Sequence, residues 1–262
     1  MPKKYALCLS GDPRYIQTCL DSIKRNIIDI NDVDVFGHFW IRTKDTPSYI
    51  TLKNCTTNNY IDYMADHCLE YIDKIKDTIQ FKNILCEEHP EFDIKFIPTD
   101  VQDINDITRH NIFVQSQYYS VYKANKLKKE YEESNGFKYD LVIRLRCDIF
   151  IDNQILLDDY NPDKLYDTII PSSNEDDVYM YDQMCIGSSE NIDVFSNYYF
   201  SMKETYDNNG YNGICAQELH IPFYLKSKGL VITHSTFGQT FKICRNIYRM
   251  SVDGYSSKLM VD

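Results

Sequence analysis

Short apolar runs that end in turns or charges alternate with apolar residues at helical spacing along most of this chain. The first run, Tyr5–Ser10, ends at a Gly-Asp-Pro-Arg turn, and apolar residues then recur at helical spacing from Ile16 to Ile27. Val33–Trp40 has the apolar character of a second strand. The order strand, tight loop, helix, strand is typical of the start of a nucleotide-binding α/β unit.

The same pattern predicts further elements up to the end of the chain. It predicts helices over Tyr60–Ile79, Val114–Tyr131, Ile192–Tyr206 and Ile214–Leu225, and strands over Phe92–Ile97, Leu141–Ile143, Thr168–Pro171, Val178–Ile186, Leu230–Thr233 and Phe241–Tyr248. The pair Asn135-Gly136 is a helix stop signal. Because no linker or repeat divides the sequence, we expect one α/β domain over residues 1–262.

The segment Tyr139–Asp152 is the most informative one for function. Its apolar run leads into Arg144, Arg146 and Asp148, which alternate and therefore point to one side of a strand. Ligands of open α/β sheets bind at the carboxyl ends of strands. Two cations and an anion on one face form either a structural arginine–aspartate pair or a corner that binds metal and phosphate.

Two more segments have candidate binding residues. Ser10, Gly11 and Arg14 lie between the first strand and the first helix, where glycine allows close approach and arginine can make a forked contact to a diphosphate. The alternative is an ordinary turn with a solvated arginine. His38 and Trp40 end the second strand, either as packed residues or as a surface on which a base stacks.

The composition limits the classes of partner. The chain has 262 residues, of which 43% are hydrophobic, and a formal net charge of −11. A sizeable core is therefore expected, and the absence of a strongly basic block argues against nucleic acid as a partner. An acidic protein that binds an anionic substrate needs a local arginine or metal ion. The sequence has no apolar run long enough for a membrane span.

The nine cysteines are scattered and include no Cys-x-x-Cys pair, so a zinc site is not expected. Several lie in apolar runs, where cysteine acts as a small core residue. Free thiols and the absence of a signal peptide predict a reducing, cytoplasmic location.

Three motifs in this order resemble a family of GT-A-like glycosyltransferases found in giant DNA viruses and bacterial polysaccharide clusters. They are the strand ending in Ser10-Gly11-Asp12-Pro13-Arg14, the strand ending in His38-Phe39-Trp40, and the Arg144-x-Arg146-x-Asp148 strand. The resemblance extends to Asp182–Ser188 and to the helix that contains Glu218. It implies a Rossmann-like α/β/α sandwich with a mostly parallel, mixed central sheet. About residues 1–150 would bind the nucleotide, and about residues 151–262 would bind the acceptor.

The resemblance also implies roles for individual residues. A divalent ion, Mn²⁺ or Mg²⁺, would bind at Asp148 with His234, and Glu218 or Asp182 would be the general base. The donor diphosphate and sugar would contact seven residues: Ser10, Gly11, Arg14, Gln117, Lys123, Arg144 and Arg146. The usual Asp-x-Asp metal motif is incomplete because position 146 is arginine, which could partly replace the missing ion. If the protein is viral, its location would be the host cytoplasm.

The expected function is therefore transfer of a sugar from a UDP- or GDP-sugar to a hydroxyl of a glycan or glycoprotein. Two alternatives remain open: a catalytically silent protein of the same fold that binds nucleotide sugars, and a sugar nucleotidyltransferase. A P-loop kinase is not expected, since the Gly-x-x-x-x-Gly-Lys-Ser/Thr loop is missing.

Overall fold

The computed structural model describes residues 2–13, 16–43, 58–92, 104–171, 178–209, 217–234 and 241–243. Its strands are β1 (Tyr5–Gly11), β2 (Val33–Ile41), β3 (Phe81–Glu88), β4 (Leu141–Arg146), β5 (Ile149–Ile151), β6 (Leu165–Pro171), β7 (Val178–Gly187), β8 (Ile232–His234) and β9 (Phe241–Ile243). Its helices are α1 (Ile16–Ile23), α2 (Asp29–Asn31), α3 (Asn58–Thr78), α4 (Ile104–Asn135), α5 (Ser189–Ser196), α6 (Tyr198–Asn209) and α7 (Gln217–Ser227). A π-helical turn, Lys24–Ile28, joins α1 to α2, and a 3-10 turn covers Leu157–Asp159.

The central sheet has seven strands in the order β3-β2-β1-β4-β7-β6-β8. The strands β3, β2, β1 and β4 are parallel to one another, β7 runs antiparallel to both β4 and β6, and β8 is parallel to β6. Strands β5 and β9 form a separate antiparallel pair. The predicted mixed, mostly parallel sheet is therefore confirmed.

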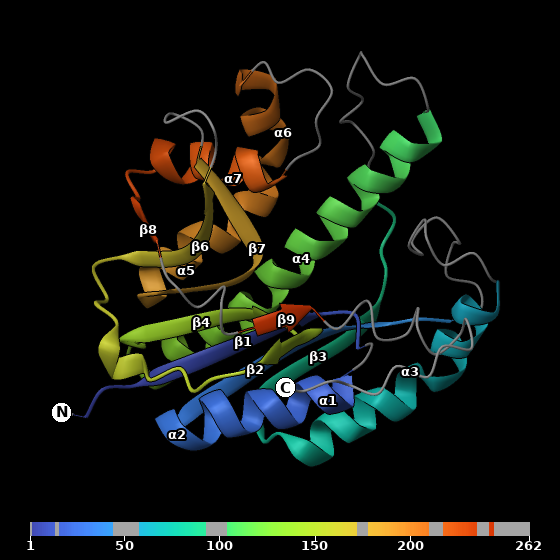
Figure 1. Ribbon diagram of the computed structural model, residues 1–262, viewed down its shortest axis with the longest axis horizontal. Coiled ribbons are helices and arrows are strands. Elements are labelled where there is room, and N and C mark those ends of the chain that lie inside the picture. The colour runs from blue at the N-terminus through green and yellow to red at the C-terminus, as the bar shows by residue number, and fades with distance from the viewer. Residues whose placement is uncertain are drawn as a thin grey trace.

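Helices cover both faces of this sheet (Figure 1). On one face, Leu7 and Leu9 of β1 pack in a core with Leu20 and Ile23 of α1 and with Ile75 of α3. The opposite face packs against α4, α5 and α7 through a second core, which includes Ala6, Cys8, Val121, Val142, Ile192 and Ile221. Alternate residues of each central strand thus enter different cores, as buried parallel strands require. The α/β/α sandwich is confirmed.

Some element boundaries differ from the predictions. Helix α4 begins at Ile104, ten residues before the predicted start, and one predicted helix over 192–206 is divided at Asn197 into α5 and α6. Most of the strand predicted over Phe92–Ile97 lies outside the described residues. The structure also has a strand that was not predicted, β3 at Phe81–Glu88, an edge strand in which no residue is fully buried. Gly136 follows α4 with φ +67°, which agrees with the predicted stop.

The direction in which strands are added reverses between β1 and β4. The chain first adds β2 and β3 on one side of β1, and it then places β4 on the other side of β1. Open α/β sheets bind ligands outside the carboxyl ends of the strands at such a reversal. The residues that follow β1 and β4 are therefore candidates for a binding site.

Among the helices that the structure describes, none is long and apolar enough to cross a membrane.

Candidate functional site at the strand ends

A polar row crosses the centre of an otherwise apolar sheet near the carboxyl ends of its strands. Ser10 of β1 is the register partner of His38 in β2 and of Arg146 in β4. All three are buried, with exposed fractions of 2% for Ser10, 0% for His38 and 6% for Arg146. Buried polar groups need partners, so this row must be satisfied by neighbouring groups or by a ligand.

Arg146 and Asp148 form a side-on ion pair at the end of β4. The Nε of Arg146 donates to Oδ1 of Asp148 at 3.0 Å, and its Nη2 donates to Oδ2 at 2.7 Å. Both side chains are almost fully buried, with exposed fractions of 8% and 4%. A bidentate pair in this environment is strong and fixes the plane of the guanidinium. The structure therefore brings these two predicted site residues together.

A second arginine–aspartate pair lies at the ends of β1 and β2. The Nε of Arg42 donates to Oδ1 of Asp12 at 2.9 Å, and its Nη2 donates to the other carboxylate oxygen. Neither residue is among the site residues predicted from the sequence. Arg42 follows directly after an apolar strand, as the Arg146 motif does, so the same signal was available. Its partner could not be found in this way, because 30 positions separate the two residues.

Cys147 connects the two pairs. Its backbone N–H donates to the carbonyl of Ser10 at 3.2 Å, and its Sγ donates to the carbonyl of Asp12 at 2.8 Å. Gly11 has φ +123°, and a Cβ built on it would lie 3.6 Å from this Sγ. Only glycine adopts such a backbone without strain, so Gly11 allows β1 to turn beside β4. Arg14 lies outside the described residues.

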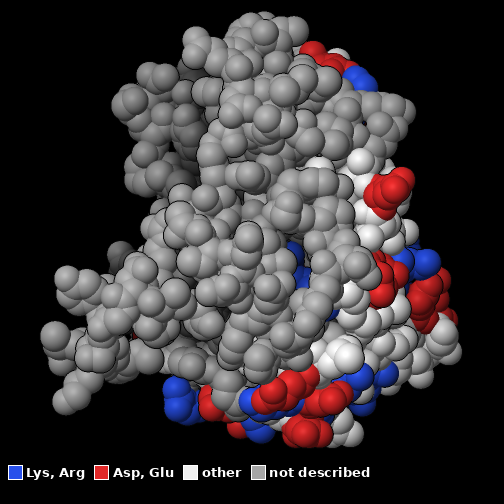
Figure 2. All heavy atoms as spheres, turned by 90° about the vertical axis from the view of Figure 1, so that its right-hand side faces the viewer, with Lys and Arg blue, Asp and Glu red and all other residues white. Residues whose placement is uncertain are grey.

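Figure 2 turns the right-hand side of Figure 1, toward which β1 runs, to face the viewer. Lys and Arg atoms are visible near the middle of this face, and basic and acidic side chains alternate along its lower margin. The described side chains visible on this face thus include both signs of charge.

Arg144 lies two residues deeper than Arg146 and is 1% exposed. Its guanidinium carbon is 5.7 Å from the centre of the Phe195 ring in α5. Its register partner is Cys185 of β7, which in turn pairs with Asp167 of β6. Burial raises the pKa of the Cys185 thiol, and the charge of Asp167 raises it further. The structure therefore places Arg144 among core residues and not at the strand ends with Arg146.

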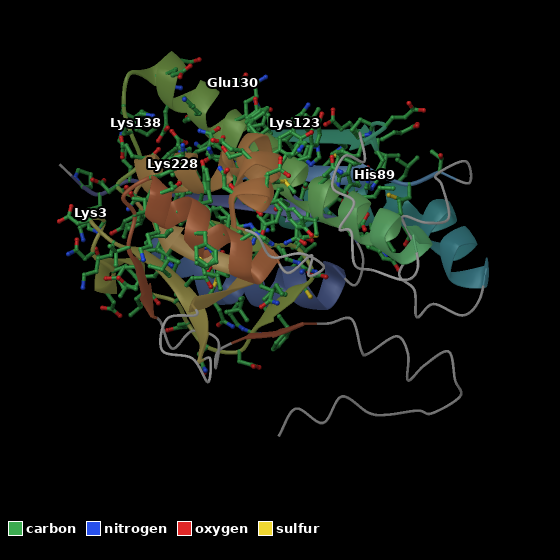
Figure 3. The ribbon with its side chains drawn as sticks, turned by 90° about the horizontal axis from the view of Figure 1, so that it is seen from above. Lys3, His89, Lys123, Glu130, Lys138 and Lys228 are labelled. Atoms are coloured by element: carbon green, nitrogen blue, oxygen red, sulfur yellow. The ribbon has the colours of Figure 1, made fainter. Side chains whose placement is uncertain are left out.

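His38 and Lys123 belong to a network that joins β2, β3 and α4. The Nδ1 of His38 is 2.8 Å from the Ser120 hydroxyl, and its Nε2 is 3.0 Å from Glu87. Lys123 is 3.1 Å from the same carboxylate. Burial lowers the pKa of His38 to about 4, although Glu87 acts in the opposite direction. In Figure 3, Lys123 and His89 lie at the margin near β3. Lys123 therefore has a structural partner there.

Trp40 is a packed residue and does not offer a stacking surface. It is 2% exposed. Its ring stacks with His89, at a centroid distance of 4.1 Å, and with Tyr119, at 5.5 Å. Of the two interpretations of His38 and Trp40, the packed one agrees with the structure.

Gln117, one helical turn before Ser120 on α4, is partly exposed.

The two predicted bases are placed by their backbone only, because their side chains lie outside what the structure describes. Met184 of β7 pairs with Leu145, so Asp182, two residues earlier in β7, lies just beyond the end of β4. Glu218 is in the first turn of α7. Since α7 leads into β8, which runs in the same direction as β4, this turn is on the carboxyl side of the sheet.

The described residues do not fit a divalent ion at Asp148. Both of its carboxylate oxygens accept hydrogen bonds from Arg146. His234, the predicted second ligand, is in β8, three strands from β4, which corresponds to about 14 Å across a sheet. Within the described ranges, no group of three or more His, Cys, Asp or Glu residues could hold a metal ion. The role of Mn²⁺ or Mg²⁺ stays a prediction.

Comparison of the chain with models of known protein families and with curated proteins finds no match.

Proposed function

We propose that this protein is a glycosyltransferase that moves a sugar from a UDP- or GDP-sugar to a hydroxyl of a glycan or glycoprotein. The observation that carries the proposal is the presence of two arginine–aspartate pairs, one buried and one part-buried, at the carboxyl ends of β1, β2 and β4. The strand order reverses between β1 and β4, and open α/β sheets bind nucleotides at the carboxyl ends of the strands at such a reversal. The motif resemblance of the sequence points to the same strand ends.

The chemistry of the reaction suits these residues. When the bond between the sugar and the diphosphate breaks, negative charge develops on the leaving group and must be stabilised. Arg146 and Arg42 place guanidinium groups there, and a guanidinium matches the geometry of phosphate oxygens with its forked donors. Gly11, which has no side chain, lets a diphosphate approach the backbone after β1.

The acceptor hydroxyl has to lose a proton to attack the sugar. Asp182 and Glu218 lie on the carboxyl side of the sheet, and either could act as the general base if the enzyme inverts configuration. We assign no step to a metal ion, since both carboxylate oxygens of Asp148 already accept hydrogen bonds from Arg146.

The test is a panel of nucleotide sugars, with release of nucleoside diphosphate and the shift in melting temperature as readouts. We expect one donor to stabilise the protein and to be turned over, and we expect Asp148→Asn to reduce turnover by about a hundredfold. Asp159→Asn, the same chemical change at an exposed aspartate, is the control and should leave turnover unchanged.

The outcomes separate the alternatives. Release of pyrophosphate in place of nucleoside diphosphate would identify a nucleotidyltransferase. Binding without turnover would favour a catalytically silent nucleotide-sugar-binding protein. The absence of both binding and turnover for every donor would refute the proposal.

A further inference from the structure

We infer that the Arg146 guanidinium, held in place by Asp148, occupies the position of the divalent ion, so that nucleoside diphosphate binds without a metal. This inference rests on the proposed function and names the group that recognises the diphosphate. Asp148 is then a positioning residue for Arg146 and not a metal ligand.

The carboxylate of Asp148 is already used by Arg146. Both oxygens of Asp148 accept from Arg146, at 3.0 and 2.7 Å, and the pair is almost fully buried. An ion that displaced the guanidinium from Asp148 would leave a buried arginine without its counter-charge. Removing one partner of a buried pair is strongly unfavourable.

Charge repulsion also opposes a divalent ion at Asp148. A divalent ion lies about 2.0–2.6 Å from a carboxylate oxygen. Nη2 of Arg146 is already 2.7 Å from one oxygen of Asp148. An ion on that oxygen would therefore sit beside a guanidinium that is permanently charged. In a poorly hydrated site, this repulsion is only weakly screened.

The second arginine–aspartate pair has the same arrangement. Asp12, the described carboxylate at the end of β1, accepts from Arg42. Each carboxylate that the structure describes directly after β1 and β4 is thus bound by an arginine. A guanidinium has five N–H donors, and a carboxylate that binds it side-on accepts from two of them. A phosphate oxygen can therefore join an arginine that an aspartate already orients.

The experiment is isothermal titration of UDP and of GDP, once with EDTA and once with Mn²⁺. We expect the Kd of the preferred nucleotide to agree within about threefold between the two conditions. In EDTA, Arg146→Ala should weaken binding at least tenfold, whereas Arg25→Ala, at an exposed arginine, should have no effect. If Arg146→Ala does not fold, Arg146→Lys keeps the charge, removes the forked donors, and should also weaken binding.

Asp148→Asn distinguishes positioning from metal ligation. A metal ligand has no role in EDTA, so its loss would leave binding in EDTA unchanged, whereas loss of a positioning residue weakens binding in EDTA and in Mn²⁺ alike. Binding of wild-type protein only in the presence of Mn²⁺, or an Asp148→Asn variant that binds normally in EDTA, would overturn this inference and leave the proposed function intact. If no nucleotide binds under either condition and no donor is turned over, both proposals fail.

Discussion

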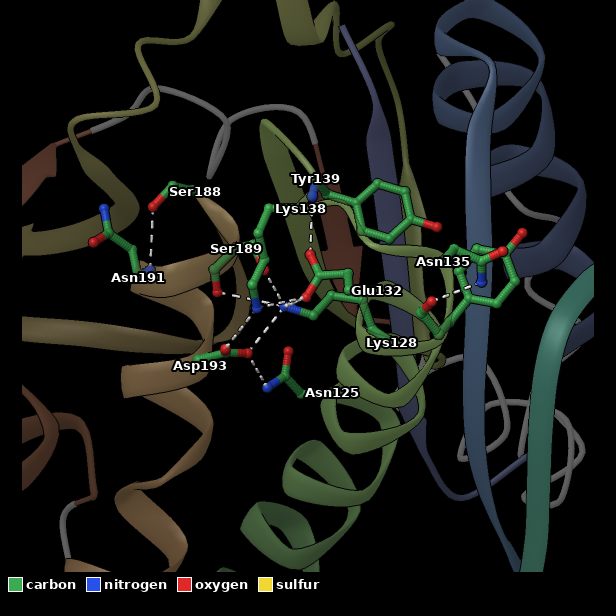
Figure 4. A network of polar contacts seen from close by, with 11 residues as sticks. Asn125, Lys128, Glu132, Asn135, Lys138, Tyr139, Ser188, Ser189, Asn191 and Asp193 are labelled. Atoms are coloured by element: carbon green, nitrogen blue, oxygen red, sulfur yellow. Dashed lines mark hydrogen bonds and ion pairs between the residues drawn. The ribbon is translucent and has the colours of Figure 1, made fainter.

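Two groups of charged side chains in this protein are largely buried, but they connect different elements of the fold. One is the pair of arginine–aspartate contacts at the ends of β1, β2 and β4. The other, shown in Figure 4, is centred on Lys128 of α4, whose Nζ lies 3.5 Å from Glu132 and 2.9 Å from Asp193. Lys128 and Glu132 are 0% exposed. This second group, the Lys128 cluster, also includes Asn125, Lys138 and Ser189.

The difference lies in what the charges connect. In the Lys128 cluster, contacts run from α4 to α5 and to the segment before β4, where the backbone N–H of Tyr139 donates to Glu132 at 2.9 Å. These contacts fix helices against the sheet, away from the carboxyl ends of β1 and β4. At those strand ends, each arginine donates to one aspartate. Burial of charge alone therefore does not distinguish the proposed site from the Lys128 cluster, and the position of the charges in the sheet topology does.

The largest expected effect concerns the Lys128 cluster. Lys128→Met would leave Glu132 buried with the weaker compensation of half-exposed Lys138. Breaking a buried pair costs about 3–5 kcal/mol of the free energy of unfolding, which urea denaturation would measure. Lys126→Met, at an exposed lysine of the same helix, should change it by less than about 0.5 kcal/mol. A loss below about 1 kcal/mol for Lys128→Met would contradict the structural role of the cluster.

The next effect tests whether His38, which shares the row of Ser10 and Arg146, is structural. Burial lowers the pKa of His38 and of His89 to about 4 each, from an unfolded value near 6.5. Between these values the unfolded chain binds more protons than the folded chain. Stability should therefore be complete above pH 6.5 and fall with acidification down to about pH 4.

At pH 5 the expected loss is about 2 kcal/mol for each histidine relative to pH 7.5. Urea denaturation at the two pH values would measure it, and His38→Gln should remove the part due to that residue. Equal free energies of unfolding at pH 7.5 and pH 5 would show that the histidines do not behave as buried neutral groups.

A pair of glycines provides a test of intermediate size. Gly11 (φ +123°) is the last residue of β1, at the carboxyl end of the strand. Gly136 (φ +67°) follows the end of α4 and precedes β4, so it lies at the opposite, amino end of the parallel strands. Alanine at either position should cost about 1–3 kcal/mol because of the positive φ. Only Gly11→Ala should also weaken nucleotide binding, measured by titration. Equal effects of both variants on binding would argue against a site at the end of β1.

The smallest effect concerns the second arginine–aspartate pair. Arg42→Lys keeps the charge but loses one of the two hydrogen bonds to Asp12, which should cost about 1 kcal/mol of stability. If Arg42 also contacts the diphosphate, nucleotide affinity should fall severalfold, and Arg25→Lys should change neither quantity. Unchanged affinity would confine recognition of the diphosphate to Arg146.

The sequence by itself determined the layered α/β fold and the composition of the strand ends. The apolar runs Tyr5–Ser10, Val33–Trp40 and Leu141–Ile143 identify the central parallel strands, because a strand buried on both faces needs a continuous apolar stretch. The charges after the last run predicted a polar corner, and Arg146 and Asp148 do lie together there, since they are only two residues apart. Local patterns of this kind need no knowledge of distant segments.

Only the tertiary structure decided which charges meet and which are fully enclosed. The partner of Arg42 is 30 positions away, and the partner of Lys123 is 36 positions away. Edge strand β3 was missed because its residues are half-buried and lack a strong apolar pattern. The sequence places Arg144 and Arg146 on the same face of one strand. Their depth differs because α5 covers Arg144 through Phe195, while β4 ends at Arg146.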